Sequence, residues 1–129
     1  MAIHLLRRLR RHDAASGLSG PRLSALSVVV FGAPMTLGEL AAAEQVRAPT
    51  MTRLVHALEQ AGYVRRERAP EDRRLVRIHA TARGKALLLE GRARRVTRLA
   101  EALDQLPAPE RTLLARASEV LDAVVRSLA

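Results

Sequence analysis

The stretch that decides the fold is residues 36–62, which read TLGELAAAEQVRAPTMTRLVHALEQAG. It holds two apolar patterns of helical period, and the second begins near Ala48. The first pattern starts with the spacing of a capping box, in which the hydroxyl of Thr36 accepts a backbone amide and Glu39 accepts one in return. Residues 44–49 are few enough to form the turn between two helices. We therefore expect a helix-turn-helix.

The second of these helices combines an apolar face with a polar one. Its apolar residues have the spacing of one helical face and so point into a core; they are Met51, Leu54, Val55 and Leu58. The side chains left outside are Thr50, Thr52, Arg53 and His56. Gly62 suits the end of the helix. Hydroxyls and free amides at a helix start can meet phosphates and base edges, so this face is expected to contact duplex DNA.

The chain changes its apolar period after this helix. Residues 63–68 and 75–79 are expected to form two strands, because their composition and alternation are typical of a sheet. Residues 69–74 between them contain a proline and several charges, as a turn does. The pattern predicts a β-hairpin, which we call the wing.

The tip of the wing carries an acidic residue directly before two arginines, Asp72-Arg73-Arg74. Either arginine can enter a narrow minor groove, where the negative potential is strongest. Asp72 can hold one guanidinium in place with two parallel hydrogen bonds, which is a structural role. The other basic residues of the hairpin are expected to add only general electrostatic attraction; they are Arg65, Arg66, Arg68 and Arg77.

Helices are expected on both sides of this central part, over residues 2–13, about 21–31, 82–104 with Thr81 as N-cap, and about 109–128. The last of them carries a continuous apolar stripe, Leu113, Ala117, Val120, Leu121, Val124 and Leu128. Such a stripe can pack against a second subunit or within the monomer, and some of it must pack within the monomer. The predicted fold is mainly α with a small β-hairpin.

The charge of the chain points to a polyanionic partner. The net charge is +9, from 22 basic and 13 acidic residues. It is concentrated, because the segment from Arg47 to Lys85 holds ten basic and four acidic residues. Aromatic residues make up only 2% of the chain, whereas proteins that hold single-stranded nucleic acid stack bases on aromatic rings. Duplex DNA is therefore the expected partner.

Several classes of protein are not expected. The chain has no cysteine, which excludes disulfides and thiolate metal sites. It shows no Gly-rich phosphate loop, nucleophile elbow or paired carboxylates, so we expect no enzyme and no cofactor. Its histidines, His4, His12, His56 and His79, lack the spacing of metal ligands. The apolar run near the start is too short for a signal peptide or a membrane span, and a cytoplasmic protein without membrane partners is expected.

The stretch from Leu37 to Leu88 resembles the DNA-binding core of the MarR family, whose members repress or activate genes as dimers. The resemblance lies in LGELA from Leu37, PTMTRLV from Pro49, the helix end at Leu58 to Gly62, DRR from Asp72 and T-x-x-G from Thr81. It implies a winged helix-turn-helix whose N- and C-terminal helices form a dimerisation region. It also implies a sequence-specific regulator of double-stranded DNA, a homodimeric repressor of a pseudo-palindromic operator.

The resemblance also assigns roles at the DNA. In the family the aspartate and the second arginine after it are the usual pair, which implies Asp72 with Arg74 and leaves Arg73 to contact a phosphate. The chain departs from the family at Arg47, where a small hydroxyl residue often caps the recognition helix. A guanidinium cannot accept from backbone amides, so Arg47 can bind a phosphate instead.

The whole chain, residues 1–129, is expected to be one domain of this type. Residues 35–88 would form the DNA-binding lobe, and residues 1–34 and 89–129 the dimerisation helices. Family members often bind small anionic or aromatic molecules between these parts, which implies a small effector that releases the DNA, although no residue identifies one. The first helix is short for the family, so this pocket can be reduced.

A nonspecific basic protein remains the alternative, either of the nucleoid type or associated with RNA. Composition alone fits this alternative equally well. The discriminating feature is a helix with a polar outer face that can enter the major groove, which a purely architectural protein does not need.

Overall fold

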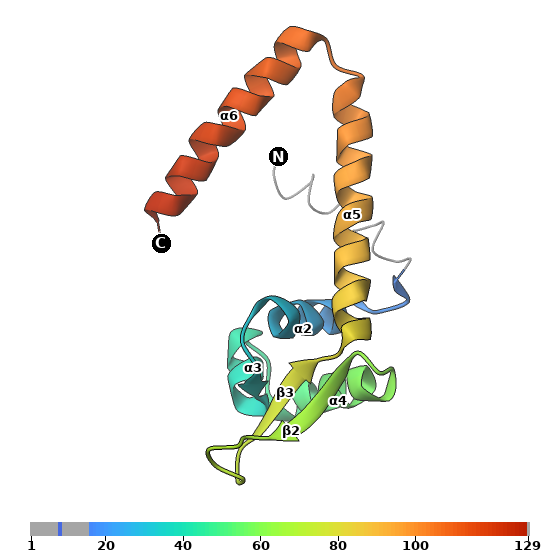
Figure 1. Cartoon of the computed structure of the whole chain (residues 1–129), viewed down its shortest axis with the longest axis vertical. Coiled ribbons are helices and arrows are strands. Elements are labelled where there is room, and N and C mark those ends of the chain that lie inside the picture. Colours follow the sequence, from blue (N-terminus) through green and yellow to red (C-terminus); the bar gives the residue numbers. More distant parts are fainter. Residues whose placement is uncertain (1–7, 9–15, 129) are drawn as a thin grey trace. The chain divides into compact units, whose positions relative to one another are not determined.

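The computed structural model describes residue 8 and residues 16–128, so the helix expected over residues 2–13 lies outside the described residues apart from Arg8. Contacts divide the chain into two units, one up to Ala93 and one from Arg94 onward, and each is described by itself. The long helix α5 (Ala82–Asp104) contributes residues to both units (Figure 1).

The first unit contains α2 (Gly20–Phe31), α3 (Leu37–Ala43) and α4 (Ala48–Gln60). A proline in the first turn starts both α2 and α4, where its missing N–H is not needed. The expected capping box starts α3: the Glu39 amide donates to Thr36 Oγ1 at 3.2 Å, and the Thr36 amide donates to Glu39 Oε2 at 2.8 Å. The predicted helix-turn-helix is therefore confirmed.

The turn between α3 and α4 depends on one residue in the left-handed region. Gln45 has a φ of 54°, and its amide donates to the carbonyl of Ala42. The amide of Val46 then donates to the carbonyl of Ala41 at 3.0 Å. These bonds satisfy carbonyls at the end of α3 and turn the chain into α4.

The sheet has three antiparallel strands, β1 (Met35–Thr36), β2 (Val64–Arg68) and β3 (Val76–Ala80), in the order β1-β3-β2. The wing is the pair β2 and β3, which confirms the predicted hairpin with each strand starting one residue later than expected. The strand β1 was not predicted, because two residues are too few to show a period of two. It pairs with β3 through Met35 opposite Ile78.

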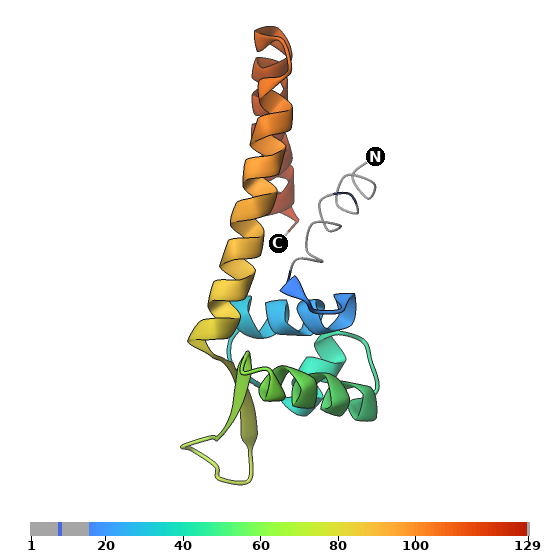
Figure 2. The same cartoon turned by 90° about the vertical axis from the view of Figure 1, so that its right-hand side faces the viewer.

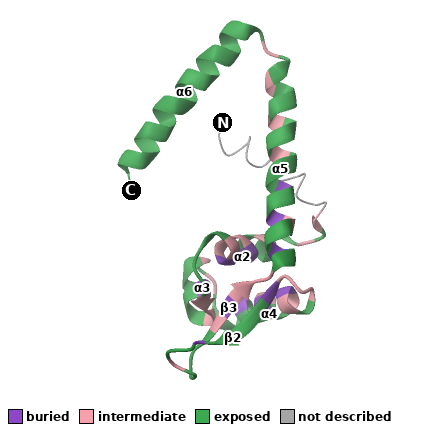
Figure 3. Ribbon diagram, in the orientation of Figure 1, coloured by how far each residue is buried: buried purple, intermediate pink, exposed green. Residues whose placement is uncertain are grey.

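One core holds the first unit together, and Figure 3 shows it as buried positions on all of its helices and on the wing strands. Helix α2, which the sequence analysis assigns to dimerisation, supplies Ala25, Leu26 and Val29 to this core. The other buried members are Leu40, Ala41, Met51, Val55, Leu58, Val64, Ile78 and Leu88. The wing strands and the apolar face of α4 are thus fixed to the same core.

The junction between β3 and α5 is held by Thr81. Its hydroxyl donates to the carbonyl of Gly62 at 2.6 Å and accepts the amide of Gly84 at 3.1 Å. The predicted N-cap is therefore confirmed. Gly62 has a φ of 79°, a region that costs residues with a Cβ about 1 kcal/mol or more. Gly84 is buried where a Cβ would overlap the carbonyl oxygen of Tyr63.

Thr81→Val is expected to lower the free energy of unfolding by about 2 kcal/mol, because it removes two partly buried hydrogen bonds worth about 1 kcal/mol each. Thr81→Ser keeps the hydroxyl and is the matched control, with a loss under about 1 kcal/mol. Urea unfolding followed by circular dichroism measures both values. Equal losses in the two variants would contradict a capping role.

The second unit consists of the end of α5 and α6 (Ala108–Ser127). An ion pair between Asp104 and Arg111 spans the turn at 3.7 Å. No described residue of α6 is buried, and Figure 3 shows the helix as exposed along its length. The expected packing of part of its stripe within the monomer is thus not seen within the second unit. Leu113, Val120, Leu121, Val124 and Leu128 are between 49% and 80% exposed.

Candidate nucleic-acid interface

The outer face of α4 is polar over its first two turns. Met51, Val55 and Leu58 are completely buried on the opposite face, which fixes the orientation of the helix. The four predicted contact residues are all exposed; they are Thr50, Thr52, Arg53 and His56. Leu54, predicted to be core, is only partly buried. The sequence pattern therefore placed the helix faces correctly, and contact of the outer face with DNA stays a prediction.

The two threonines on this face differ in their hydrogen bonds. The hydroxyl of Thr52 donates to the carbonyl of Ala48 at 2.9 Å, one turn earlier in the same helix. The hydroxyl of Thr50 has no partner among the described residues. Of these two described threonines, Thr50 is thus the one whose hydroxyl proton is free for another molecule.

The start of α4 has no side-chain cap. Arg47 occupies the N-cap position with extended backbone, and its side chain makes no capping hydrogen bond. Pro49 in the first turn has no amide to satisfy, which reduces the need for a cap. Arg47 is exposed beside this open helix start, where an anion would meet both the guanidinium and the free amides.

The tip of the wing holds one arginine in a fixed position. Arg74 Nε donates to Asp72 Oδ1 at 3.1 Å, and Arg74 Nη2 donates to Asp72 Oδ2 at 3.2 Å. The backbone amide of Arg74 also donates to Asp72 Oδ1, at 3.0 Å. The side chain of Arg74 is still 90% exposed. The guanidinium is thus oriented by a carboxylate and remains open to solvent, as the implied pairing requires.

These bonds act on the ionisation of Asp72. The side-chain hydrogen bonds from Arg74, followed by its backbone amide, hold the pKa of Asp72 below its ordinary value. The carboxylate is therefore charged at neutral pH and accepts these hydrogen bonds from Arg74 there. Arg73 has no carboxylate partner among the described residues and is exposed, and its carbonyl accepts Arg68 Nη1 at 3.5 Å.

Most of the arginines expected to give general attraction have acidic partners. The ion pairs are Arg65 with Glu67 at 2.5 Å, Arg66 with Glu59 at 3.2 Å, and Arg77 with Glu71. The hydrogen bond from Arg65 lowers the pKa of Glu67. The pKa of Glu71 is lowered chiefly by a hydrogen bond from its own backbone amide and then by one from Arg77. Each pair cancels a charge, so these arginines attract DNA less than a count of basic residues suggests. The partners of Arg66 and Arg77 lie on other parts of the fold, so a count of charges along the sequence does not reveal them.

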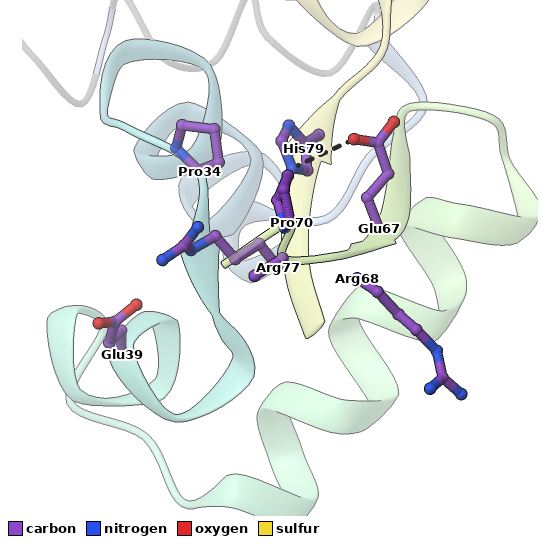
Figure 4. Close-up of a pocket in the computed structure, with 8 residues that line it drawn as sticks. Pro34, Glu39, Glu67, Arg68, Pro70, Arg77 and His79 are labelled. Carbon is purple, nitrogen blue, oxygen red and sulfur yellow. Dashed lines mark ion pairs between the residues drawn. The ribbon is translucent and has the colours of Figure 1, made fainter. Parts of the chain in front are cut away.

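A shallow pocket of about 330 Å³ lies beside the wing, where its strands approach the loop (Figure 4). Its lining residues are Pro34, Glu39, Glu67, Arg68, Ala69, Pro70, Arg77 and His79. Figure 4 shows Glu67 and His79 facing each other, with Nε2 and Oε2 3.5 Å apart, and Arg68 extending away. The charged lining groups have partners in the protein, Glu39 in the capping box and Arg77 at Glu71.

Helix α4 and the wing face the same side of the first unit. In Figures 1 and 2, α4 and the wing loop both lie below α2 within the first unit. A duplex on this side can meet α4 in a major groove and the tip of the wing in the neighbouring minor groove, as winged helices do. Arg53 on the outer face of α4 and Arg74 at the wing tip are both exposed.

Two kinds of site are not found in the described part of the chain. No group of three or more histidine, cysteine or acidic residues there could hold a metal ion. Within the same residues, no helix has the length and apolar composition needed to cross a bilayer.

Comparison with known proteins gives concordant matches. A family model described as MarR matches residues 31–76. An uncharacterized HTH-type transcriptional regulator of Mycobacterium bovis is 37% identical over 123 residues, which cover 95% of this chain and 86% of the relative.

Solved structures share the fold. A transcriptional regulator of Thermotoga maritima matches with a TM-score of 0.88 at 23% identity, over 98% of this chain and 89% of that one. A mutant of the Staphylococcus aureus regulator MepR, bound to an oligodeoxyribonucleotide, matches with a TM-score of 0.77 at 17% identity, over 95% of this chain and 91% of that one. The arrangement of α3, α4 and the wing is therefore an arrangement found in transcription regulators.

Proposed function

Because the chain belongs to the MarR family of transcriptional regulators, we propose that it is a homodimeric repressor that recognises a pseudo-palindromic site in double-stranded DNA. Like its relatives, the chain is a DNA-binding regulator and not an enzyme. The observation that carries the finer proposal is the joint exposure of Arg53 on α4 and of Arg74, held by Asp72, on the wing.

The proposed contacts divide into base reading and backbone positioning. Arg53 lies on the outer face of α4 and can bond the two major-groove acceptors of a guanine. Arg74 enters the minor groove in the orientation that Asp72 gives it. The remaining contacts go to phosphates, from Arg47 at the helix start, from Thr50, and from Arg73 at the wing. His56, one turn after Arg53, reaches a base or a phosphate.

The proposed dimer rests on the second unit. The stripe on α6 is exposed along its length in the single chain, with Leu128 at 80% and Leu113 at 69%. Exposed apolar stripes of this extent mark protein interfaces. A twofold dimer doubles the DNA contacts and presents two copies of α4 to two half-sites. We assign residues 89–129 and 1–34 to this dimer and residues 35–88 to DNA, and release by a small effector rests on the family resemblance alone.

A selection experiment tests the proposal. The purified protein is incubated with random duplexes of about 30 base pairs, long enough for two half-sites one helical turn apart, and bound duplexes are enriched. We expect one two-part motif, called the selected duplex from here on, which is retained at a salt concentration that releases random duplex. Equal retention of both duplexes would favour the nonspecific basic protein. Sedimentation equilibrium should give twice the chain mass of 14.1 kDa.

Asp72→Ala is expected to weaken binding to the selected duplex by about 1 kcal/mol per wing, roughly fivefold, the cost of ordering one long side chain on binding. The sign is informative, because this change raises the net charge and would strengthen binding if attraction alone mattered. Fluorescence anisotropy titrations with selected and random duplex measure the two effects. Tighter binding to both duplexes would mean that Asp72 does not position Arg74.

A further inference from the structure

Thr50 and Thr52 have the same side chain and are both exposed, but only one of them has a free hydroxyl proton. A threonine hydroxyl donates one proton. In Thr52 this proton is given to the carbonyl of Ala48 at 2.9 Å, whereas the hydroxyl of Thr50 has no partner among the described residues. The two residues therefore cannot donate the same hydrogen bond to DNA.

The phosphate backbone of DNA offers only acceptors, so a side chain that binds a phosphate must donate. Thr50 can donate at once, and it lies in the first turn of α4, close to the free amides of the helix start. Thr52 would first have to break its bond to Ala48. Because the oxygen of Thr52 is turned back along the helix, its methyl group is what the exposed side chain offers to a neighbouring molecule.

We propose that Thr52 is a specificity-determining residue that contacts the 5-methyl group of a thymine through its own methyl group, while Thr50 binds a phosphate. The thymine methyl is the one apolar feature among the base edges of the major groove, and a threonine methyl is a suitable partner for it. Thr52 directly precedes Arg53, so the thymine lies beside the base that Arg53 contacts. This inference rests on the proposed function.

Replacement of single thymines by deoxyuridine tests the inference, because it removes only the 5-methyl group. Each half-site of the selected duplex should contain one thymine whose replacement weakens binding of the unaltered protein about fourfold. This is the effect of losing one buried methyl group. Thr52→Ser loses the methyl and should be insensitive to this replacement. Thr52→Val keeps the methyl, loses the hydroxyl, and should remain as sensitive as the unaltered protein.

Thr50→Val is the matched control. It removes the free hydroxyl and should weaken binding to selected and random duplex by the same factor, without any change in the response to deoxyuridine. Both substituted positions are exposed, and thermal unfolding of each variant should follow that of the unaltered protein.

Several results would overturn the inference. One is a selected duplex without a thymine in either half-site, or one in which no replacement by deoxyuridine weakens binding. Another is a loss of affinity in Thr52→Val that Thr52→Ser does not share, which would make the hydroxyl the reading group. If no duplex is enriched from the random pool, the proposed function itself fails, and that result is distinct from the others.

Discussion

Replacing Arg53 by alanine is expected to weaken binding to the selected duplex by about 2 kcal/mol per half-site, roughly thirtyfold, because a bidentate contact to a guanine is lost. Arg53 is exposed on α4, on the side away from the fully buried Met51 and Val55. The loss should fall on the selected duplex, while binding to random duplex, which depends on the phosphates, changes little. Anisotropy titrations at several salt concentrations measure both.

The control for this prediction is Arg53→Lys, which keeps the charge but cannot present the planar fork of a guanidinium. It should leave binding to random duplex unchanged and restore little of the preference for the selected duplex. If lysine restores full binding to both, Arg53 acts as a phosphate contact. The dependence of affinity on salt would then fall by about one ion per site in Arg53→Ala.

Gly84→Ala is expected to destabilise the fold by about 3 kcal/mol. Helix propensity alone predicts the opposite sign, because alanine is favoured over glycine inside a helix by about 1 kcal/mol. At this position, however, the new Cβ would overlap the carbonyl oxygen of Tyr63 and lie 3.3 Å from Leu26 Cδ1. Both neighbours are held in place, Tyr63 by its bond to the Thr81 amide and Leu26 by the core, so the backbone must shift.

The matched control is Gly38→Ala in α3, where a Cβ would meet nothing within 4 Å. This change should leave the stability unchanged or raise it by up to about 1 kcal/mol. Urea unfolding of both variants gives the comparison. A Gly84→Ala variant as stable as the unaltered protein would show that the packing of α5 against Tyr63 is looser than described.

The local features of the fold could be predicted because their causes are close in sequence. The capping box of α3 needs only Thr36 and Glu39, and the faces of α4 follow from the spacing of its apolar residues. Asp72 and Arg74 are two residues apart, so their pairing also follows from local geometry once the hairpin is recognised. These short-range causes place both elements of the candidate interface.

The remaining features depend on parts that are far apart in sequence. Strand β1 exists because Met35 lies opposite Ile78, and no local pattern marks a strand of two residues. The partners of Arg66 and Arg77 follow from packing and register, so the cancellation of their charge could not be read from the sequence. How much of the α6 stripe is covered by its own chain could not be predicted either, since an apolar stripe has the same sequence pattern whether it is covered or left open.

The central claim is that α4 of each subunit contacts the bases of one half-site in the major groove, while the wing tip enters the adjoining minor groove. Dimethyl sulfate protection of the selected duplex tests it most directly, because the reagent methylates guanine N7 in the major groove, one of the acceptors assigned to Arg53. We predict protected guanines in two clusters about one helical turn apart, and loss of this protection in Arg53→Ala under conditions where the variant still occupies the duplex. Full reactivity of every guanine on a saturated duplex, or protection that persists in Arg53→Ala, would contradict the account.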